Sequence, residues 1–390
     1  MEVTDVVIVG AGPSGLATSA CLTKYSIPHI ILEKHDCNVS LWRKHTYDRV
    51  NLHLAKEFCS LPLLPHSPSS PTFLSKSEFL DYIDNYVSHF NISPRYNRTV
   101  DVAVFDGAEG KWRIETTNTK EGGCREAYVA KYVVVATGEN SEEYIPEVSG
   151  LDSFEGEIVH SKNYKCGSKH KGKEVLVVGC GNSGMEIAYD LNESQARTSI
   201  VIRNPVHVLT RELVHRGMSM MRYLPAQIVD VVITFVANLE YGDLSEYGIH
   251  RPSKGPFYLK QVTGRSPVID VGTIQKIRDG EIKVISSGIK RIEKKKVIFE
   301  KNNLEKDFDV IVFATGYKSV ANNWLKDYKY VLNEKGMPKN EVPSHWKGEK
   351  GIYCAGLSRR GLLGVSMDAE AIANDINLSL KLVAQNSSYQ

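Results

Sequence analysis

The chain has 390 residues, a formal net charge of +2 at pH 7, and hydrophobic and charged fractions of 42% and 24%. This composition is typical of a globular protein that is long enough for two or three domains with cores of their own. Because the charge is nearly balanced, the composition gives no reason to expect a nucleic acid as partner.

The seven cysteines form no C-x-x-C pair and no disulfide framework, which predicts reduced thiols in a cytoplasmic protein and disfavours a dithiol reductase. The first strand begins at Asp5 with no leader pattern before it, so we expect neither a signal peptide nor a transmembrane segment. The apolar stretch from Ile228 to Asn238 is too short to span a bilayer and contains Asp230. It predicts a buried helix, with a membrane-touching or substrate-tunnel element as the alternative. The scattered histidines lack the spacing of metal ligands, so we expect no metal.

A glycine fingerprint follows the first expected strand. The apolar run Asp5–Val9 predicts a strand buried on both faces, and it leads into Gly10, Gly12 and Gly15 at the start of a helix expected from Ser14 to Tyr25. In such a turn, backbone N–H groups and the helix N-terminus face a pyrophosphate with no Cβ in the way.

An acid, Glu33, ends the next expected strand, which begins at Pro28. A carboxylate at this point accepts hydrogen bonds from ribose hydroxyls and repels a 2′-phosphate. We therefore expect the first fingerprint to bind FAD or NAD.

The same strand, glycine turn and helix recur later in the chain. The second strand is expected at Glu174–Val178 and its helix at Ser183–Ser194. The residues expected to bind a dinucleotide here are Gly179, Gly181, Asn182, Ser183 and Gly184. The sequence therefore predicts a second nucleotide site.

Two arginines indicate which nucleotide binds there. The expected strand Thr198–Arg203 ends in a cation, and Arg211 follows shortly after it. A guanidinium offers a planar fork of donors that suits the 2′-phosphate of NADP. The alternative for both is a solvated arginine, and the motif does not fix the reach of Arg211.

The order of the remaining elements indicates that one nucleotide domain interrupts another. Strands are expected at Trp112–Thr117 and Ala127–Ala136, and buried strands return at Phe308–Tyr317 and Gly351–Gly356, after a loop-rich stretch at Gly248–Gly264. We predict an α/β fold with two Rossmann-like dinucleotide-binding domains, the second inserted in the first.

The expected boundaries follow from this order. The FAD-binding domain is expected at residues 1–165 and 308–390, and the NADPH-binding domain at residues 166–307.

Two further motifs carry a family resemblance. Phe154-x-Gly156-x-x-x-His160-x-x-x-Tyr164-Lys165 and Phe313-Ala-Thr-Gly-Tyr317 resemble the two signatures of class B flavin-dependent monooxygenases. The resemblance implies a mainly structural and conformational role, coupling the two nucleotide domains, and His160 is not expected to act as an acid or base. The signature residues are Phe154, Gly156, His160, Tyr164, Thr315 and Gly316.

Within that family the chain is similar over nearly its whole length to the plant YUCCA-type flavin monooxygenases. The matching motifs are Ser40–Arg49, Leu52–Leu54, Ala136–Asn140, Pro267–Gly272 and Arg359–Asp368. The resemblance implies that Trp42 and Arg43 bind cofactor and that His53 is a candidate catalytic residue. Ala55 departs from the family pattern, which usually has a proline there, and this bears on the substrate.

The resemblance also implies an activity. It predicts an FAD-dependent enzyme that uses NADPH and O2, works through a flavin C4a-peroxide and acts on a small molecule. The expected reaction is the oxidative decarboxylation of indole-3-pyruvate to indole-3-acetate, an auxin. The alternatives are N- or S-oxygenation of a specialised metabolite, and a flavin-binding protein that has lost oxygenation. The sequence leaves the oligomeric state open.

Overall fold

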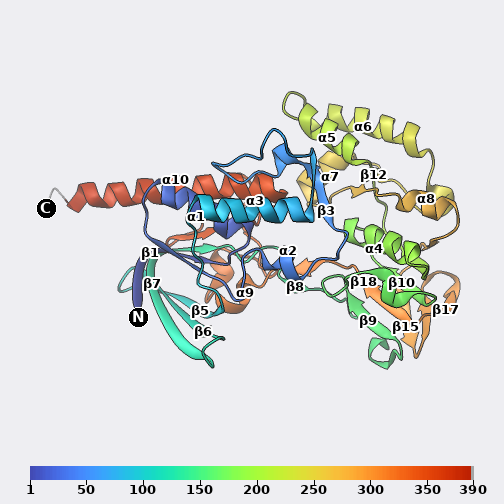
Figure 1. Ribbon diagram of the computed structural model, residues 1–390, viewed down its shortest axis with the longest axis horizontal. Helices are drawn as coiled ribbons and strands as arrows, with labels where there is room; N and C mark the ends of the chain where they lie inside the picture. Colours follow the sequence, from blue (N-terminus) through green and yellow to red (C-terminus); the bar gives the residue numbers. More distant parts are fainter. Residues whose placement is uncertain (388–390) are drawn as a thin grey trace. The chain divides into compact units, whose positions relative to one another are not determined.

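The computed structural model describes residues 1–387. By its internal contacts the chain divides into two compact units. Figure 1 shows the chain coloured by residue number. The first unit contains residues 1–45, 56–142 and 317 onwards, and the second contains residues 46–55 and 143–316. The second unit is thus inserted in the first along the chain, and the predicted fold class is confirmed.

The first unit is an α/β structure. Its strands are β1 (Glu2–Val9), β2 (His29–Leu32), β4 (Phe73–Ser75), β5 (Arg98–Asp106), β6 (Lys111–Asn118), β7 (Cys124–Val135), β19 (Tyr317–Lys318) and β20 (Ile352–Cys354). Its helices are α1 (Pro13–Lys24), α2 (Ser40–Lys44), α3 (Lys76–His89), α9 (Ala321–Trp324) and α10 (Gly361–Ser387), with short 3-10 helices at Lys56–Phe58 and Tyr328–Tyr330. The short strand β8 (Glu142–Glu143) lies at the boundary of the two units.

The main sheet of the first unit places the first fingerprint at the end of a parallel strand. The strand order is β2-β1-β7-β6-β5, and β20 also pairs with β7. Strands β2, β1, β7 and β20 run parallel, whereas β6 runs antiparallel to β5 and β7. Residues Val6–Val9 of β1 are buried because α1 packs on this sheet and α10 packs on α1.

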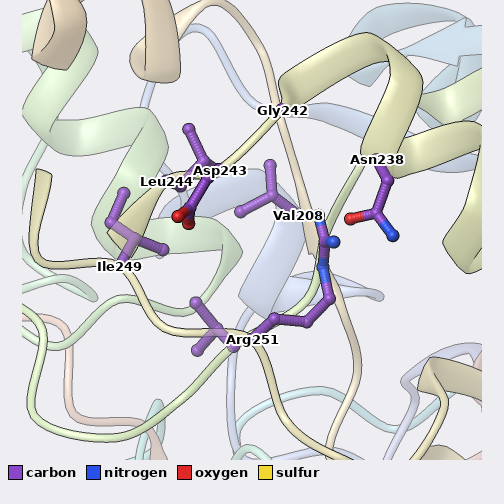
Figure 2. Close-up of a pocket in the computed structure, with 8 residues that line it drawn as sticks. Val208, Asn238, Gly242, Asp243, Leu244, Ile249 and Arg251 are labelled. Carbon is purple, nitrogen blue, oxygen red and sulfur yellow. The ribbon is translucent and has the colours of Figure 1, made fainter. Parts of the chain in front are cut away.

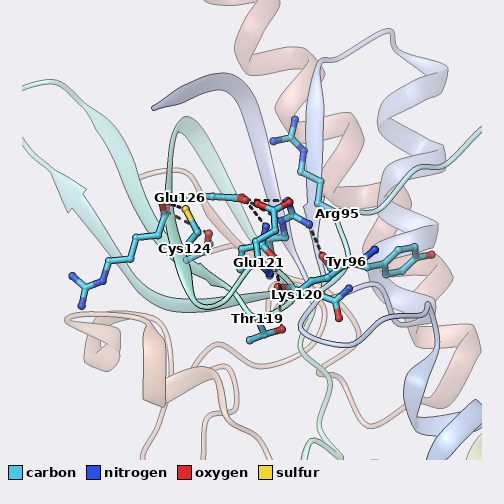
Figure 3. Close-up of polar contacts among 12 residues, drawn as sticks. Arg95, Tyr96, Thr119, Lys120, Glu121, Cys124 and Glu126 are labelled. Carbon is cyan, nitrogen blue, oxygen red and sulfur yellow. Dashed lines mark hydrogen bonds and ion pairs between the residues drawn. The ribbon is translucent and has the colours of Figure 1, made fainter.

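A polar network holds the antiparallel edge of this sheet together. Arg98 on β5 contacts both carboxylate oxygens of Glu126 on β7, at 3.0 and 3.3 Å. Asn118 Nδ2 and the Tyr128 hydroxyl also donate to that carboxylate, at 2.9 and 2.5 Å. Figure 3 shows the polar contacts around Glu126.

The second unit carries a fully parallel sheet. The strands of the second unit as a whole are β3 (Asn51–Ala55), β9 (Glu157–His160), β10 (Glu174–Val178), β11 (Arg197–Val201), β12 (Val208–Leu209), β13 (Val268–Ile269), β14 (Lys283–Ile285), β15 (Ile289–Glu293), β16 (Lys296–Phe299), β17 (Glu305–Asp307) and β18 (Val310–Phe313). Its helices are α4 (Asn182–Glu193), α5 (Arg211–Met220), α6 (Ala226–Tyr241), α7 (Pro256–Thr263) and α8 (Thr273–Arg278), with 3-10 helices at Leu151–Ser153, Gly167–His170, Ser245–Tyr247 and Lys301–Asn303. The sheet order is β14-β11-β10-β18-β9, and β15, β16 and β17 form a separate antiparallel sheet.

The division into compact units differs from the predicted domain boundaries. Strand β18 is parallel to both β10 and β9, so residues 157–160 and 310–313 belong to the second unit. The predicted division at residues 166 and 307 separates β10 from its partner β18, and it leaves β9 and β18 together outside the domain of the second fingerprint. The two divisions differ because single strands of buried parallel sheets look alike in sequence, and only their pairing shows which sheet they join.

The stretch predicted to be a buried helix forms α6, which is amphipathic and is buried on one face only. Val229, Ile233 and Ala237 are buried, whereas Val231 and Phe235 are 72% and 62% exposed. No helix within residues 1–387 is long and apolar enough to cross a membrane.

The acid within α6 has a local role. The carboxylate of Asp230 is buried and accepts the backbone N–H groups of Phe257 at 2.8 Å and Tyr258 at 3.0 Å. These N–H groups belong to the first turn of α7, which lies in the stretch predicted to be loop-rich. Asp230 thus satisfies otherwise unpaired donors at a helix N-terminus.

Candidate functional site

The first glycine of each fingerprint adopts the same backbone conformation. Gly10 has φ = +111° and Gly179 has φ = +110°. A Cβ on Gly10 would lie 2.5 Å from the carbonyl oxygen of Ala136, and a Cβ on Gly179 would lie 2.5 Å from that of Ala314. Both positions therefore require glycine, because of the left-handed backbone and because the next strand runs too close for a side chain.

The second and third glycines also match between the two fingerprints. A Cβ on Gly15 or Gly184 would lie 1.9 Å from the carbonyl oxygen of the first glycine of its own fingerprint. In contrast, a Cβ on Gly12 or Gly181 would meet nothing within 4 Å. The first and third glycines of each turn are thus packed against backbone, whereas the second glycine is open. In turns of this kind a pyrophosphate approaches the backbone at the second glycine.

Glu33 lies directly against the first fingerprint. Its side chain is buried, and it accepts hydrogen bonds from the N–H of Ala11 at 2.7 Å and from the N–H of His35 at 2.9 Å. Burial raises the pKa of this carboxyl, and the two N–H donors oppose that shift. The backbone of Ala11 also accepts a hydrogen bond from Val39, which ties the start of α2 to the same turn.

The side chains of Trp42 and Arg43 hold α2 against α3. The Trp42 ring lies 4.8 Å from the Phe79 ring, measured between centroids. Arg43 donates to Asn38 Oδ1 at 3.2 Å and forms an ion pair with Asp84. These contacts fix the wall that follows the first fingerprint, and direct contact of either residue with a cofactor stays a prediction.

In the second unit, Arg203 follows the end of β11 by two residues and is exposed. Within the described part of the chain, its guanidinium makes no hydrogen bond or ion pair. Asn182, at the start of α4, accepts a hydrogen bond from the N–H of Ile269 at 2.8 Å, and Ser183 follows it, partly exposed. An unpaired guanidinium beside a glycine turn suits an anionic ligand.

A buried acid, Glu186, lies in the second turn of α4 and binds the segment that carries His53. The hydroxyl of Tyr47 donates to Glu186 Oε2 at 2.5 Å, and His53 Nε2 lies 3.3 Å from Oε1. Burial raises the pKa of Glu186. Burial and the nearby charge of Arg211, the first residue of α5, lower the pKa of His53 to about 4, so this imidazole is neutral at pH 7.

Three further contacts attach residues 46–55 to the rest of the second unit. Lys165 Nζ donates to the carbonyl of Thr46 at 3.1 Å, and the Lys165 carbonyl accepts the N–H of Asp48 at 3.0 Å. The Arg49 guanidinium lies 4.3 Å from the centre of the Tyr189 ring on α4. Tyr47 and Glu186 were not among the site residues predicted from the sequence. The available signal was an acid among the apolar positions of a helix that should pack on a sheet.

His160 links the two family signatures within the second unit. Its ring is buried, and Nδ1 accepts the N–H of Lys162 at 3.2 Å. The proton must then be on Nε2, which donates to the carbonyl of Gly316 at 3.1 Å. Burial lowers the pKa of His160, which favours the neutral form of the ring. This geometry fits the structural role that the resemblance implies.

The other signature residues also make structural contacts. Tyr164 is buried and donates to Asp190 on α4 at 2.6 Å. A Cβ on Gly156 would lie within 2.5 Å of the Phe154 ring, so this glycine lets the ring pack beneath it. The Thr315 hydroxyl donates to the carbonyl of Tyr144.

The comparisons with known proteins agree with this geometry. The family model described as "Flavin-binding monooxygenase-like" matches residues 3–348. The chain is 55% identical over 383 residues to a protein of Arabidopsis thaliana named "Probable indole-3-pyruvate monooxygenase YUCCA10", covering 98% of this chain and 100% of that protein. It is 46% identical over 382 residues to "Indole-3-pyruvate monooxygenase YUCCA6" of the same plant, covering 96% and 90%.

Solved structures show the same fold. A flavin-containing monooxygenase from Stenotrophomonas maltophilia matches with a TM-score of 0.73 at 20% identity, covering 97% of this chain and 100% of that one. OTEMO in complex with FAD and NADP matches with a TM-score of 0.74 at 16% identity, covering 97% and 84%. The chain belongs to the flavin-binding monooxygenase-like family, and the predicted resemblance to its YUCCA-type members is confirmed.

Proposed function

We propose that FAD binds at the first fingerprint and NADPH at the second. The open second glycine of each turn supports this assignment, because each leaves backbone accessible to a pyrophosphate. Glu33 favours a ribose with free hydroxyls in the first unit, whereas the unpaired Arg203 favours a 2′-phosphate in the second. This difference in charge beside two equivalent turns is the observation that carries the proposal.

We further propose that the enzyme uses NADPH and O2 to decarboxylate indole-3-pyruvate oxidatively to indole-3-acetate. The support is its similarity to proteins named indole-3-pyruvate monooxygenases, over nearly its full length. FAD, when bound, supplies the redox and oxygen chemistry. The residues of this chain bind and orient the cofactors, and the two signatures fix the strands that carry the second fingerprint.

The His53 side chain is the proposed catalytic group of this chain. Because its pKa is low, the imidazole is neutral at pH 7. With Nε2–H directed at Glu186, Nδ1, which is buried and has no hydrogen-bond partner within residues 1–387, carries the lone pair and can accept a proton. Glu186 positions the ring through Nε2. We also propose a cytoplasmic location, which the free thiols of all seven cysteines support.

Product analysis by mass spectrometry tests the proposed function. FAD-loaded protein is incubated with NADPH, air and indole-3-pyruvate, with an amine and sulfide panel alongside and catalase to remove peroxide-driven breakdown. Indole-3-acetate that is insensitive to catalase and matches the NADPH consumed is the expected result. An oxygenated amine or sulfide in its place would mean N- or S-oxygenation, and NADPH oxidation that yields only peroxide would mean that oxygenation has been lost.

A further inference from the structure

A pocket of about 380 Å³ lies within the second unit, between the segment that leads into β12 and the C-terminal end of α6. This volume falls in the range of about 300–1,000 Å³ typical of small-molecule sites. The apolar part of its wall consists of Val206, Val208, Leu244 and Ile249, all of them buried or half-buried. The wall can therefore take an apolar group of modest size.

Two opposite charges also line this pocket without pairing. The guanidinium of Arg251 makes no hydrogen bond or ion pair with any residue in the described part of the chain. Burial lowers the pKa of Arg251 and the charge of Asp243 opposes this shift, so the two groups interact across a gap. In Figure 2 the Asp243 carboxylate and the Arg251 guanidinium are drawn apart, with Val208 between them in that view.

The carboxylate of Asp243 is held in place and ionised. It accepts the N–H and the hydroxyl of Ser245, each at 2.9 Å, and these donors lower its pKa. Asn238, from α6, adds a side-chain amide to the same wall. The pocket thus offers a fixed anion, an unpaired cation and an apolar surface.

We propose that this pocket binds a small apolar α-amino acid. The guanidinium of Arg251 would receive its carboxylate, the carboxylate of Asp243 its ammonium group, and the four apolar residues its side chain. A zwitterion fits better than a simple acid because the acid would leave Asp243 facing a second negative charge. A simple amine would likewise leave Arg251 without a partner.

Isothermal titration calorimetry on FAD-loaded, full-length protein without NADPH tests the ligand class. The probes are L-leucine, 4-methylpentanoate, which lacks the ammonium group, and 3-methylbutylamine, which lacks the carboxylate. L-tryptophan, indole-3-propionate and tryptamine form a second matched set. We expect saturable binding of at least one of the two amino acids, with its acid and amine counterparts weaker by about tenfold or more.

Three variants assign the binding to this pocket. Arg251→Gln and Asp243→Asn should each weaken amino-acid binding by about tenfold or more, because each removes one charge contact. Asn at position 243 keeps an acceptor for the Ser245 N–H. Arg291→Gln, on the exposed strand β15 of the same unit, should leave binding unchanged. Circular dichroism and thermal unfolding show whether each variant is folded.

Absence of saturable binding of both amino acids to the wild-type protein would overturn the proposal. Equal binding by the folded Arg251→Gln and Asp243→Asn variants would overturn it as well, as would an acid or amine that binds as tightly as its amino acid. These measurements involve no turnover, and the leucine set lacks the indole ring of the proposed substrate, so its outcome is independent of the proposed activity. For the indole compounds, the Arg251→Gln and Asp243→Asn variants separate binding in this pocket from binding at the substrate site.

Discussion

The hydroxyl of Tyr47 donates a hydrogen bond of 2.5 Å to Oε2 of Glu186, a buried acid on the helix that carries the second fingerprint. This contact joins residues 46–55 to α4, although the segment lies between parts of the first unit in sequence. Tyr47→Phe should therefore lower the free energy of unfolding by about 1–3 kcal/mol, because it leaves a buried oxygen without its donor.

Urea unfolding monitored by circular dichroism measures this change. Tyr223→Phe is the matched control, since the Tyr223 side chain is 85% exposed, and it should unfold like the wild-type protein. If Tyr47→Phe also matched the wild type, the hydrogen bond to Glu186 would contribute nothing to stability.

The low pKa of His53 predicts an acid-sensitive term in stability. The folded pKa of about 4 lies below the ordinary value of 6.5, so the folded protein binds fewer protons than the unfolded chain between these values. The contribution of the neutral His53 side chain to the free energy of unfolding is complete above pH 6.5 and is lost as the pH falls through about 4. The raised pKa of Glu186 acts in the opposite direction, so the comparison needs a variant of His53 itself.

His53→Gln should show a smaller loss of stability than the wild-type protein between pH 6.5 and pH 4, because glutamine does not titrate. Thermal unfolding at a series of pH values measures the difference. His215→Gln, an intermediate-exposure site on α5, serves as control. Parallel curves for His53→Gln and the wild type would exclude a buried neutral imidazole at position 53.

The glycines of the first fingerprint should fail in different ways. Gly12 has φ = −72° and ψ = 180°, a conformation open to any residue, and no protein atom stands where its Cβ would lie. Gly12→Val should therefore fold but purify without yellow FAD. Gly15→Val should be destabilised by at least about 1–3 kcal/mol, since even its Cβ would lie 1.9 Å from the carbonyl of Gly10.

Absorbance at the flavin band and thermal unfolding together separate these outcomes. Gly181→Val and Gly184→Val are the matched pair in the second unit. Gly181→Val should keep its FAD. A yellow Gly12→Val protein would contradict the assignment of FAD to the first fingerprint.

The sequence predicted the local elements better than their assembly. The fingerprint strands appear as β1 and β10, and the helices that follow them as α1 and α4, because glycine turns and buried β-branched runs are strong local signals. The attachment of residues 46–55 to α4 was missed. It depends on a side-chain contact between residues 139 positions apart, which no local pattern encodes.

Arg203 should determine the preference for NADPH over NADH. Its guanidinium is exposed and unpaired within residues 1–387, so Arg203→Gln should leave the fold and the bound FAD unchanged. The Michaelis constant for NADPH should rise by about tenfold or more, while that for NADH changes little, because only NADPH carries the phosphate.

Steady-state oxidation of both nicotinamides measures this preference. Arg197→Gln, on the same strand β11 and 63% exposed, is the matched control and should alter neither constant. An equal rise for NADPH and NADH would remove Arg203 from the 2′-phosphate site.

The Glu126 network should make the first unit sensitive to acid. The hydrogen bonds from Arg98 and then Tyr128 lower the pKa of Glu126 from 4.5 to about 2. A carboxyl with a lowered folded pKa stabilises the protein above pH 4.5, and this contribution is lost as the pH falls through about 2. Glu126→Gln should therefore lower the free energy of unfolding by about 1–3 kcal/mol at pH 7 and by much less at pH 2.

Urea unfolding at both pH values measures this difference. Glu115→Gln, exposed on the neighbouring strand β6, is the control. An equal cost of Glu126→Gln at pH 7 and pH 2 would show that the charge of Glu126 does not stabilise the sheet edge seen in Figure 3.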